Sequence, residues 1–168
     1  MSKMAREWTP LYFGRHKGKT LPWVIFHDPD WFFWAYKNGI FKDKQTLRKE
    51  VREIYRKSRS IRIPQKGSER QLAEYGFSNR KGRFVNLEIV PVNQPQHEGS
   101  TPVYRLPVID LSVPGDTRSY DKLGYRILLK AVKFVLFGNS KCRMTEKRCA
   151  SFFNNDSNFD FSNPLMLE

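Results

Sequence analysis

The stretch from Phe13 to Phe41 constrains the fold most, because it holds three of the four tryptophans and the clearest helix boundaries in the chain. Asp28 can cap a helix start with its carboxylate, and Pro29 suits the first helical position because it has no amide hydrogen to lose. Asn38 and Gly39 supply the stop, since glycine adopts the left-handed conformation without steric cost. The helix between them carries many large rings, so we expect it to be packed on nearly all sides. The rings are those of Trp31, Phe32, Phe33, Trp34 and Tyr36.

A basic, glycine-bounded turn precedes this helix. Residues 11–13 predict a short strand, and residues 14–19 (GRHKGK) predict the tight turn that reverses it into a β-hairpin. Two glycines can direct backbone amides outward while the cations supply positive charge, a combination that suits a phosphate. A hairpin tip is also an ordinary place to keep charges in water, so both interpretations stay open. The phosphate interpretation assigns contacts to Arg15, His16, Lys17 and Lys19.

The same residues resemble a known module. The spacing of Phe-Gly, Lys-Gly-Lys, Asp-Pro and the tryptophans is similar to the small C-terminal module of exodeoxyribonuclease X-like proteins and to a related family described as quorum-sensing-regulated virulence factors. The resemblance covers residues 1–60 only, and the acidic exonuclease domain of those enzymes is not found before Phe13. It implies a compact accessory module for nucleic acid, DNA above all, that accompanies enzymes without supplying their chemistry. The matching residues are Phe13, Gly14, Lys17, Gly18, Lys19, Asp28, Pro29, Trp31, Trp34 and Gly39.

Charge is strongly positive and unevenly spread along the chain. The formal net charge is +13, which is typical of proteins that bind polyanions. Residues 1–83 contain 20 Lys and Arg against 8 Asp and Glu, whereas residues 84–168 contain 10 against 9. We therefore expect a nucleic-acid-binding surface mainly in the first half.

A second helix is predicted over residues 45–59. Its apolar residues recur at helical spacing and form a stripe for burial: Leu47, Val51, Ile54, Tyr55 and Ser58. On another face, four arginines follow the helix over about 16 Å at 1.5 Å per residue, long enough to track several phosphates. Glu50 and Glu53 could instead neutralise them on an ordinary solvated face. The arginines are Arg48, Arg52, Arg56 and Arg59.

Residues 61–83 are polar, basic and interrupted by proline and glycine, and we interpret them as a linker or ordered loop around a short helix at residues 69–75. The half that follows, residues 84–153, begins with two predicted strands at 84–90 and 103–113. Prolines at 107 and 114 favour an edge position for the second strand. The intervening residues 91–102 predict an exposed loop.

A long helix is predicted from a cap at Ser119 to Phe137, ended by Gly138. Its apolar face comprises Leu123, Ile127, Leu128, Ala131, Val132, Val135 and Leu136. Thr145 can cap a further short helix, at whose start basic residues oppose the helix dipole unless an anion binds there. This mismatch predicts a second phosphate surface, with ordinary surface charge as the alternative. Its residues are Lys141, Arg143 and Arg148, accompanied by Lys147.

The tail, residues 154–168, contains no Lys or Arg but several acidic and large apolar side chains. Such a segment can dock on a partner protein, lie over the basic surface, or cover exposed core. The sequence leaves these three possibilities open.

Catalytic and metal-binding patterns are weak. Glu88, Asp110 and Asp121 have no spacing that joins them into a metal site, and the histidines and the two cysteines lack the close pairing of a zinc motif. We expect no cofactor and no catalysis. Two cysteines without a disulfide framework favour a reducing compartment, the cytoplasm, and no apolar run is long enough for a membrane span.

Together these features predict an α+β protein in which a hairpin-and-helix module, residues 1–60, precedes a strand-and-helix half. The predicted function is non-catalytic nucleic-acid binding, with DNA favoured over RNA by the resemblance. If the strand is single, Trp23 could stack on bases. An adaptor that grips a partner enzyme in a mobile-element or phage-defence complex is the alternative, and a metal-dependent nuclease is a third hypothesis.

Overall fold

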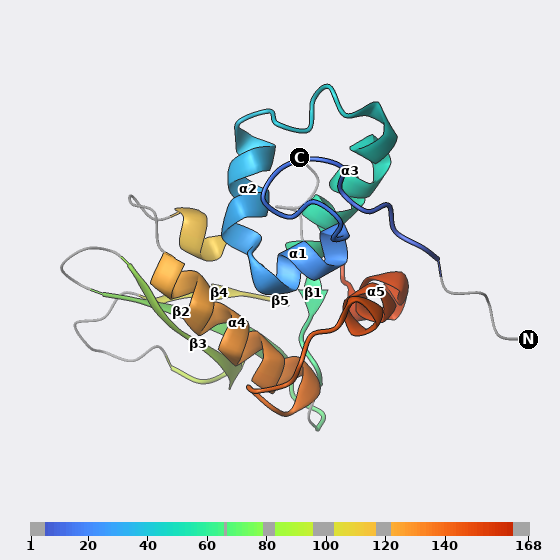
Figure 1. Ribbon diagram of the computed structural model, residues 1–168. Helices are drawn as coiled ribbons and strands as arrows, with labels where there is room; N and C mark the ends of the chain where they lie inside the picture. Colours follow the sequence, from blue (N-terminus) through green and yellow to red (C-terminus); the bar gives the residue numbers. More distant parts are fainter. Residues whose placement is uncertain (1–5, 66, 79–82, 96–102, 117–121, 163–168) are drawn as a thin grey trace, which may run out of the picture.

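The computed structural model describes residues 6–65, 67–78, 83–95, 103–116 and 122–162. Over these residues the chain has the predicted α+β fold, with five α-helices and two small antiparallel sheets. Figure 1 shows α1, α2, α3 and α5 grouped on one side, while α4 lies across one face of a three-stranded sheet. The helices are α1 (Leu21–His27), α2 (Pro29–Lys37), α3 (Arg48–Ser58), α4 (Lys122–Phe137) and α5 (Glu146–Asn154). The strands are β1 (Ile61–Arg62), β2 (Gln71–Phe77), β3 (Phe84–Pro91), β4 (Val103–Leu106) and β5 (Val108–Ile109).

The predicted aromatic helix is confirmed as α2. The Asp28 carboxylate accepts a hydrogen bond from the Trp31 amide at 3.3 Å, and Gly39 follows the helix with a φ of 74°. Its packing differs from the prediction, because Trp34 is 52% exposed. Tyr36 also reaches the surface, where its ring stacks on Tyr55 of α3 with centroids 3.9 Å apart. One face of α2 therefore stays in solvent.

The predicted N-terminal β-hairpin is wrong, since residues 11–13 form no strand. The loop is closed by two backbone hydrogen bonds, from the Leu11 amide to the Lys19 carbonyl (2.9 Å) and from the Gly18 amide to the Leu11 carbonyl (2.8 Å). Helix α1, which the sequence did not predict, begins at Leu21 immediately after the loop. No residues remain for a returning strand, so the basic segment is a loop anchored to helices.

The predicted short helix at residues 69–75 is also wrong, because this segment forms β2, the central strand of the order β3-β2-β4. Ala73 and Tyr75 are completely buried and alternate with partly exposed neighbours, which is the period of a strand. Pairing with β3 on one side and β4 on the other satisfies the backbone and outweighs the local helix preference. Residues 61–65 and 67–78 are thus part of the folded body.

The predicted strand at 103–113 divides at Pro107. Strand β4 takes the sheet edge, as the prolines predicted, whereas β5 leaves the sheet and pairs with β1. Val113 and Pro114 lie in one of three short 3₁₀ turns, Gln45–Leu47, Val113–Asp116 and Asp156–Asn158. The rest of the predicted loop beyond residue 95 and the predicted cap Ser119 lie outside the described residues.

Buried side chains from both halves of the chain form one continuous core. Phe32 of α2, Ile54 of α3, Tyr75 of β2 and Leu128 of α4 are all completely buried members of this core. One member of the predicted apolar face of α4 is misplaced, because Leu123 is 64% exposed. The core is therefore shared by α-helices and sheet, and it holds the surfaces described below in fixed positions.

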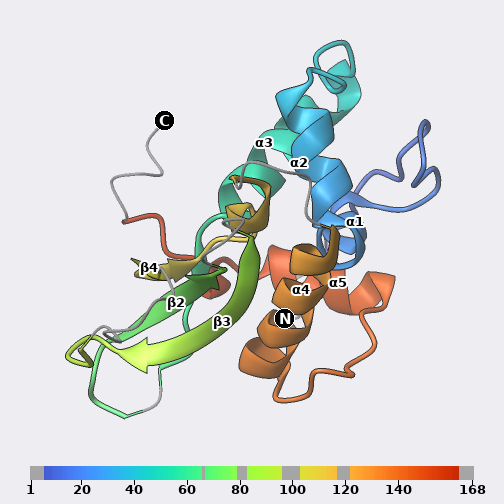
Figure 2. The same ribbon diagram turned by 90° about the vertical axis from the view of Figure 1, so that its left-hand side faces the viewer.

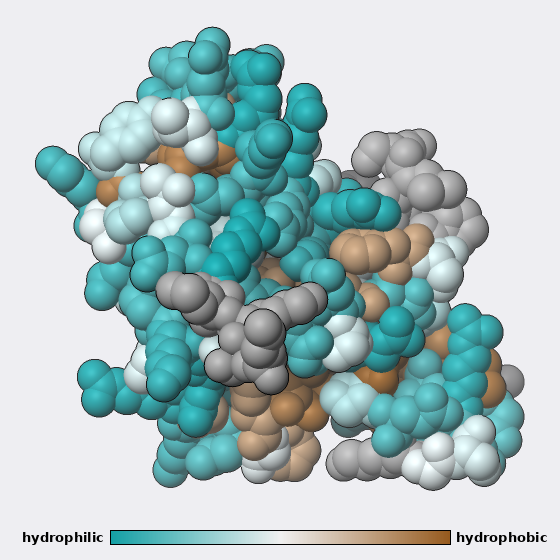
Figure 3. All heavy atoms as spheres, turned by 90° about the vertical axis from the view of Figure 1, so that its right-hand side faces the viewer, coloured by the Kyte–Doolittle hydropathy of each residue, from teal (hydrophilic) through white to brown (hydrophobic). Residues whose placement is uncertain are grey.

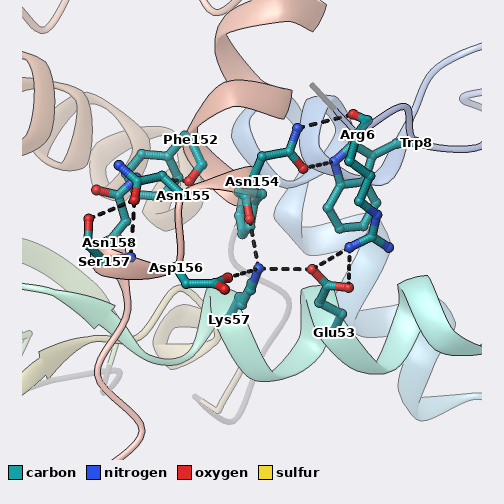
Figure 4. Close-up of polar contacts among 11 residues, drawn as sticks. Arg6, Trp8, Glu53, Lys57, Phe152, Asn154, Asn155, Asp156, Ser157 and Asn158 are labelled. Carbon is teal, nitrogen blue, oxygen red and sulfur yellow. Dashed lines mark hydrogen bonds and ion pairs between the residues drawn. The ribbon is translucent and has the colours of Figure 1, made fainter. Parts of the chain in front are cut away.

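A buried lysine joins three distant segments of the chain (Figure 4). The Lys57 ammonium on α3 donates to Glu53 Oε2 (2.9 Å), to the Phe153 carbonyl at the end of α5 (2.8 Å) and to Asp156 Oδ1 (3.0 Å). Glu53 in turn accepts two hydrogen bonds from Arg6, at 2.6 and 2.8 Å. Because a buried ammonium is costly unless every proton is bonded, this network specifies how the end of α5 docks on α3.

Lys57→Met should lower the free energy of unfolding by about 2 to 3 kcal/mol, because it leaves the Phe153 carbonyl and Glu53 without the buried donor. Chemical denaturation measures the change. Lys49→Met on the exposed side of the same helix is the matched control, expected within about 0.5 kcal/mol of the wild type. Equal stability of the two variants would show that the network does not hold α5 in place.

Candidate nucleic-acid interface

Two side chains of the basic loop at residues 14–19 contact a carboxylate of the protein itself. His16 Nε2 lies 2.9 Å from Asp28 Oδ2, and the His16 side chain is only 13% exposed, with its ring against Trp31. Arg15 Nη1 lies 3.3 Å from the same carboxylate oxygen. The assignment of a phosphate contact to His16 is therefore not supported, because its imidazole instead contacts Asp28, the residue that caps the start of α2. Lys17 remains exposed at the tip.

The half-buried Trp23 ring packs against other side chains, and its predicted stacking on a base stays a prediction. Its ring stacks on the His27 imidazole at 3.8 Å with an interplanar angle of 10°, and the Lys19 ammonium lies 4.8 Å from its centroid. Burial lowers the pKa of His27, so the imidazole is neutral at pH 7. The stack is thus an internal contact between successive turns of α1.

The predicted arginine ridge on α3 is reduced from four side chains to three. Arg48, Arg52 and Arg56 are exposed, with Arg56 lying over the Phe161 ring at 4.1 Å. Arg59 is half-buried, where it donates to the Tyr55 hydroxyl (2.9 Å) and lies 3.5 Å from Asp110 Oδ2. Arg59 is therefore used in an internal ion pair and is not placed for a phosphate.

The two glutamates of α3 do not neutralise this ridge. Glu50 Oε1 accepts from the Thr9 amide at 2.8 Å, and Glu53 binds Arg6 and Lys57. Glu50 therefore contacts the N-terminal segment, and Glu53 contacts that segment and Lys57 of its own helix. The exposed arginines consequently keep their positive charge on the surface.

A cleft of 980 Å³ brings together residues that are distant in the sequence. It lies between the segment around β1, the start of β2, the end of α4, the start of α5 and the tail after it. Four cations and one carboxylate line it, and they are Arg62, Arg70, Lys147, Arg148 and Asp160. This side of the molecule, where α3 and α5 lie, is predominantly hydrophilic, with hydrophobic surface confined to small patches (Figure 3).

The four cations of the cleft differ in the hydrogen bonds and ion pairs that they make within the protein. Arg62 donates to the carbonyls of Ser157 (3.2 Å) and Phe159 (3.0 Å), and its Nη1 lies 3.8 Å from Asp160 Oδ2. Within the described residues, no carboxylate lies within ion-pair distance of Arg70 or Lys147. These two exposed side chains therefore add positive charge to the cleft, and Arg70 interacts with Asp160 only at longer range.

Among the described residues, one carboxylate lines the cleft, that of Asp160, and it is hydrogen-bonded within the protein. The Ser162 hydroxyl and amide donate to Asp160 Oδ1 at 2.6 and 3.0 Å and lower the pKa of Asp160, so it is ionised at neutral pH. Its charge compensates part of that of Arg62. The described lining keeps a net charge of about three positive units.

The start of α5 adds polar groups to the same cleft. Thr145 caps the helix as predicted, since its hydroxyl oxygen accepts from the Arg148 amide at 3.2 Å. The acidic residue of the first turn, Glu146, is directed to α1, where it accepts from the Thr20 amide (3.2 Å) and hydroxyl (2.7 Å). The positive helix end is therefore flanked in the cleft by Lys147 and Arg148.

Of the second predicted phosphate surface, Arg148 lines the cleft, whereas Lys141 and Arg143 are exposed outside it. Sequence reasoning missed Arg62 and Arg70, because both lie in the segment interpreted as a linker. Their only sequence signal was the positive charge of that segment. Their position depends on pairing of β1 with β5 and of β2 with its neighbours.

No group of metal-ligating side chains occurs among the residues that the structure describes. Asp110 is buried and accepts from the Ser112 amide and hydroxyl, Glu88 is exposed on β3, and Asp121 lies outside the described residues. In the described part of the chain, no helix has the length and apolar character needed to cross a membrane.

Comparison of the chain with protein-family models, with curated proteins and with solved structures found no match. The resemblance of residues 1–60 to the exonuclease-associated module stays a prediction.

The two cysteines near the cleft should differ in reactivity. Burial raises the pKa of Cys149 to about 12, so at pH 8 it stays a thiol inside the core, whereas Cys142 is partly exposed beside Arg148. Because the thiolate is the nucleophile, iodoacetamide at pH 8 should modify one cysteine per folded chain. Mass spectrometry identifies the site. Cys142→Ser should abolish the labelling, and modification of Cys149 at a similar rate would contradict the described core.

Proposed function

We propose that this protein binds nucleic acid without catalysis and holds the phosphates of its ligand in the cleft beside α5, in the reducing environment of the cytoplasm. One observation carries the proposal: the lining combines four cations with a single carboxylate. Phosphates bound there would be met by the exposed Arg70 guanidinium and Lys147 ammonium, by the donors of Arg148 other than Nη1, and by the positive end of a helix.

The remaining charge supports the same function. The chain carries a formal net charge of +13, and Arg48, Arg52, Arg56 and Lys17 are exposed on other surfaces. Such charge raises the rate of encounter with a polyanion and adds sequence-independent affinity. The resemblance of residues 1–60 favours DNA as the ligand.

Arg70→Glu combined with Lys147→Glu should weaken binding of a fluorescent oligonucleotide about tenfold or more at low salt. The slope of log affinity against log salt concentration should fall in magnitude by about one and a half, because two phosphate contacts are lost. Fluorescence anisotropy over a salt series measures both quantities.

Lys37→Glu combined with Lys42→Glu is the matched control for this experiment. It changes the net charge equally, but these exposed lysines lie at and after the end of α2, at the end of the molecule away from α4 and α5 (Figure 2). Long-range electrostatics alone would weaken binding equally in both double variants. That outcome would remove the cleft from the proposal.

A second candidate function is docking of a partner protein, and a specific observation favours it. Leu123 and Phe134 are 64% and 62% exposed, and eleven residues place them on one face of α4, about three turns apart. Such exposed apolar side chains are typical of interaction surfaces. Elution of the wild-type protein from a DNA column at very low salt would favour this adaptor function over nucleic-acid binding.

A further inference from the structure

We infer that the cleft beside α5 takes unpaired nucleotides, with a base against its apolar wall and the flanking phosphates on its cations. The inference rests on the proposed function and specifies its ligand as single-stranded nucleic acid. The cleft has the chemistry for both parts of a nucleotide, because cations and apolar side chains line the same space.

The apolar wall is the observation that phosphate binding alone does not explain. Seven apolar residues line the cleft beside the four cations: Ile63, Pro64, Pro107, Val108, Leu136, Phe137 and Phe152. A phosphate gains nothing from such a surface, since its oxygens need donors. An unpaired base, in contrast, exposes two flat apolar faces that are stabilised by transfer from water to a surface of this kind.

An aromatic ring and a guanidinium meet in this wall. The Arg148 guanidinium lies 5.9 Å from the centroid of the partly buried Phe137 ring at the end of α4. Phenylalanine rings and guanidinium planes are the groups on which proteins stack unpaired bases. Arg148 Nη1 donates to Cys142 Sγ and to the Arg143 carbonyl (3.2 Å), so Arg148 can contact a base with its plane or a phosphate with its other donors, next to a ring that favours the base.

A double helix does not match this site. Its bases are stacked and paired, so their faces are unavailable to an apolar wall, and its phosphates lie on a stiff convex surface. The cleft is concave, and at 980 Å³ its volume is that of a pocket for a small molecule. A flexible single strand can enter such a pocket and place a base and its phosphates together.

The test compares three ligands of equal length by fluorescence anisotropy: a single-stranded DNA oligonucleotide, the same strand paired as duplex, and an abasic strand that retains every phosphate. We expect the intact single strand to bind about tenfold or more tightly than the abasic strand, because stacking of a base contributes at this level. The duplex should bind more weakly than the intact single strand.

Phe137→Leu supplies the residue-level test, because it keeps an apolar side chain in the core but removes the ring. It should lower the affinity for the intact strand several-fold and leave the affinity for the abasic strand unchanged. Phe134→Leu is the matched control, since this exposed phenylalanine lies on the same helix outside the cleft lining, and it should change neither affinity.

The outcomes separate this inference from the proposed function. Equal affinity for intact and abasic strands, or tighter binding of the duplex, would overturn the inference while nucleic-acid binding stands. Failure of all three ligands to bind at low salt would instead overturn the proposed function. Loss of affinity for the intact strand in Phe134→Leu but not in Phe137→Leu would place the base on the outer face of α4 and also overturn the inference.

Discussion

The attachment of α5 at both of its ends is the constraint on which the candidate site depends. At its start, Glu146 accepts two hydrogen bonds from Thr20, and at its end the buried Lys57 ammonium binds the Phe153 carbonyl and Asp156. The chain after α5 then returns to β1, where the Asp160 amide donates to the Ser60 carbonyl at 2.8 Å. These contacts hold the start of α5 opposite β1. Without them the cations of α5 would not share one cleft with Arg62 and Arg70.

This arrangement explains how positive charge can be concentrated without being neutralised. The carboxylates close to the site are directed inward or used locally: Glu146 is bound to Thr20, and Glu53 to Arg6 and Lys57. Asp160 pairs with Arg62 and also interacts electrostatically with Arg70. Mutual repulsion among the remaining cations disfavours the empty cleft and would be relieved by an anion. The tail takes part in this balance, since Phe159 is buried and Asp160 lines the cleft, as two of the possibilities drawn from the sequence anticipated.

The sequence predicted the secondary structure correctly where local signals and tertiary structure agree. The caps of α2 and α5, the glycine stops, the buried stripe of α3 and the strand at residues 84–91 follow from short-range patterns and are confirmed. The prediction failed where pairing between distant segments determines the secondary structure. Residues 71–77 have a helix-like composition but form β2, because β3 and β4 pair with them on both sides. The same limit applies to the site. Arg148 was identified from a conflict with the helix dipole, whereas Arg62 and Arg70 reach the site only through the sheets. The side chains of Arg59 and His16 contact carboxylates from other segments instead.

The central claim is that nucleic acid occupies the cleft between α5 and β1. Acetylation of lysines in the free protein and in its complex with a single-stranded oligonucleotide, analysed by mass spectrometry, tests it directly, because both sets of lysines are exposed in the free protein. The account predicts that Lys147 becomes protected in the complex while Lys37 and Lys42 react as before. Undiminished acetylation of Lys147 under saturating ligand would contradict it.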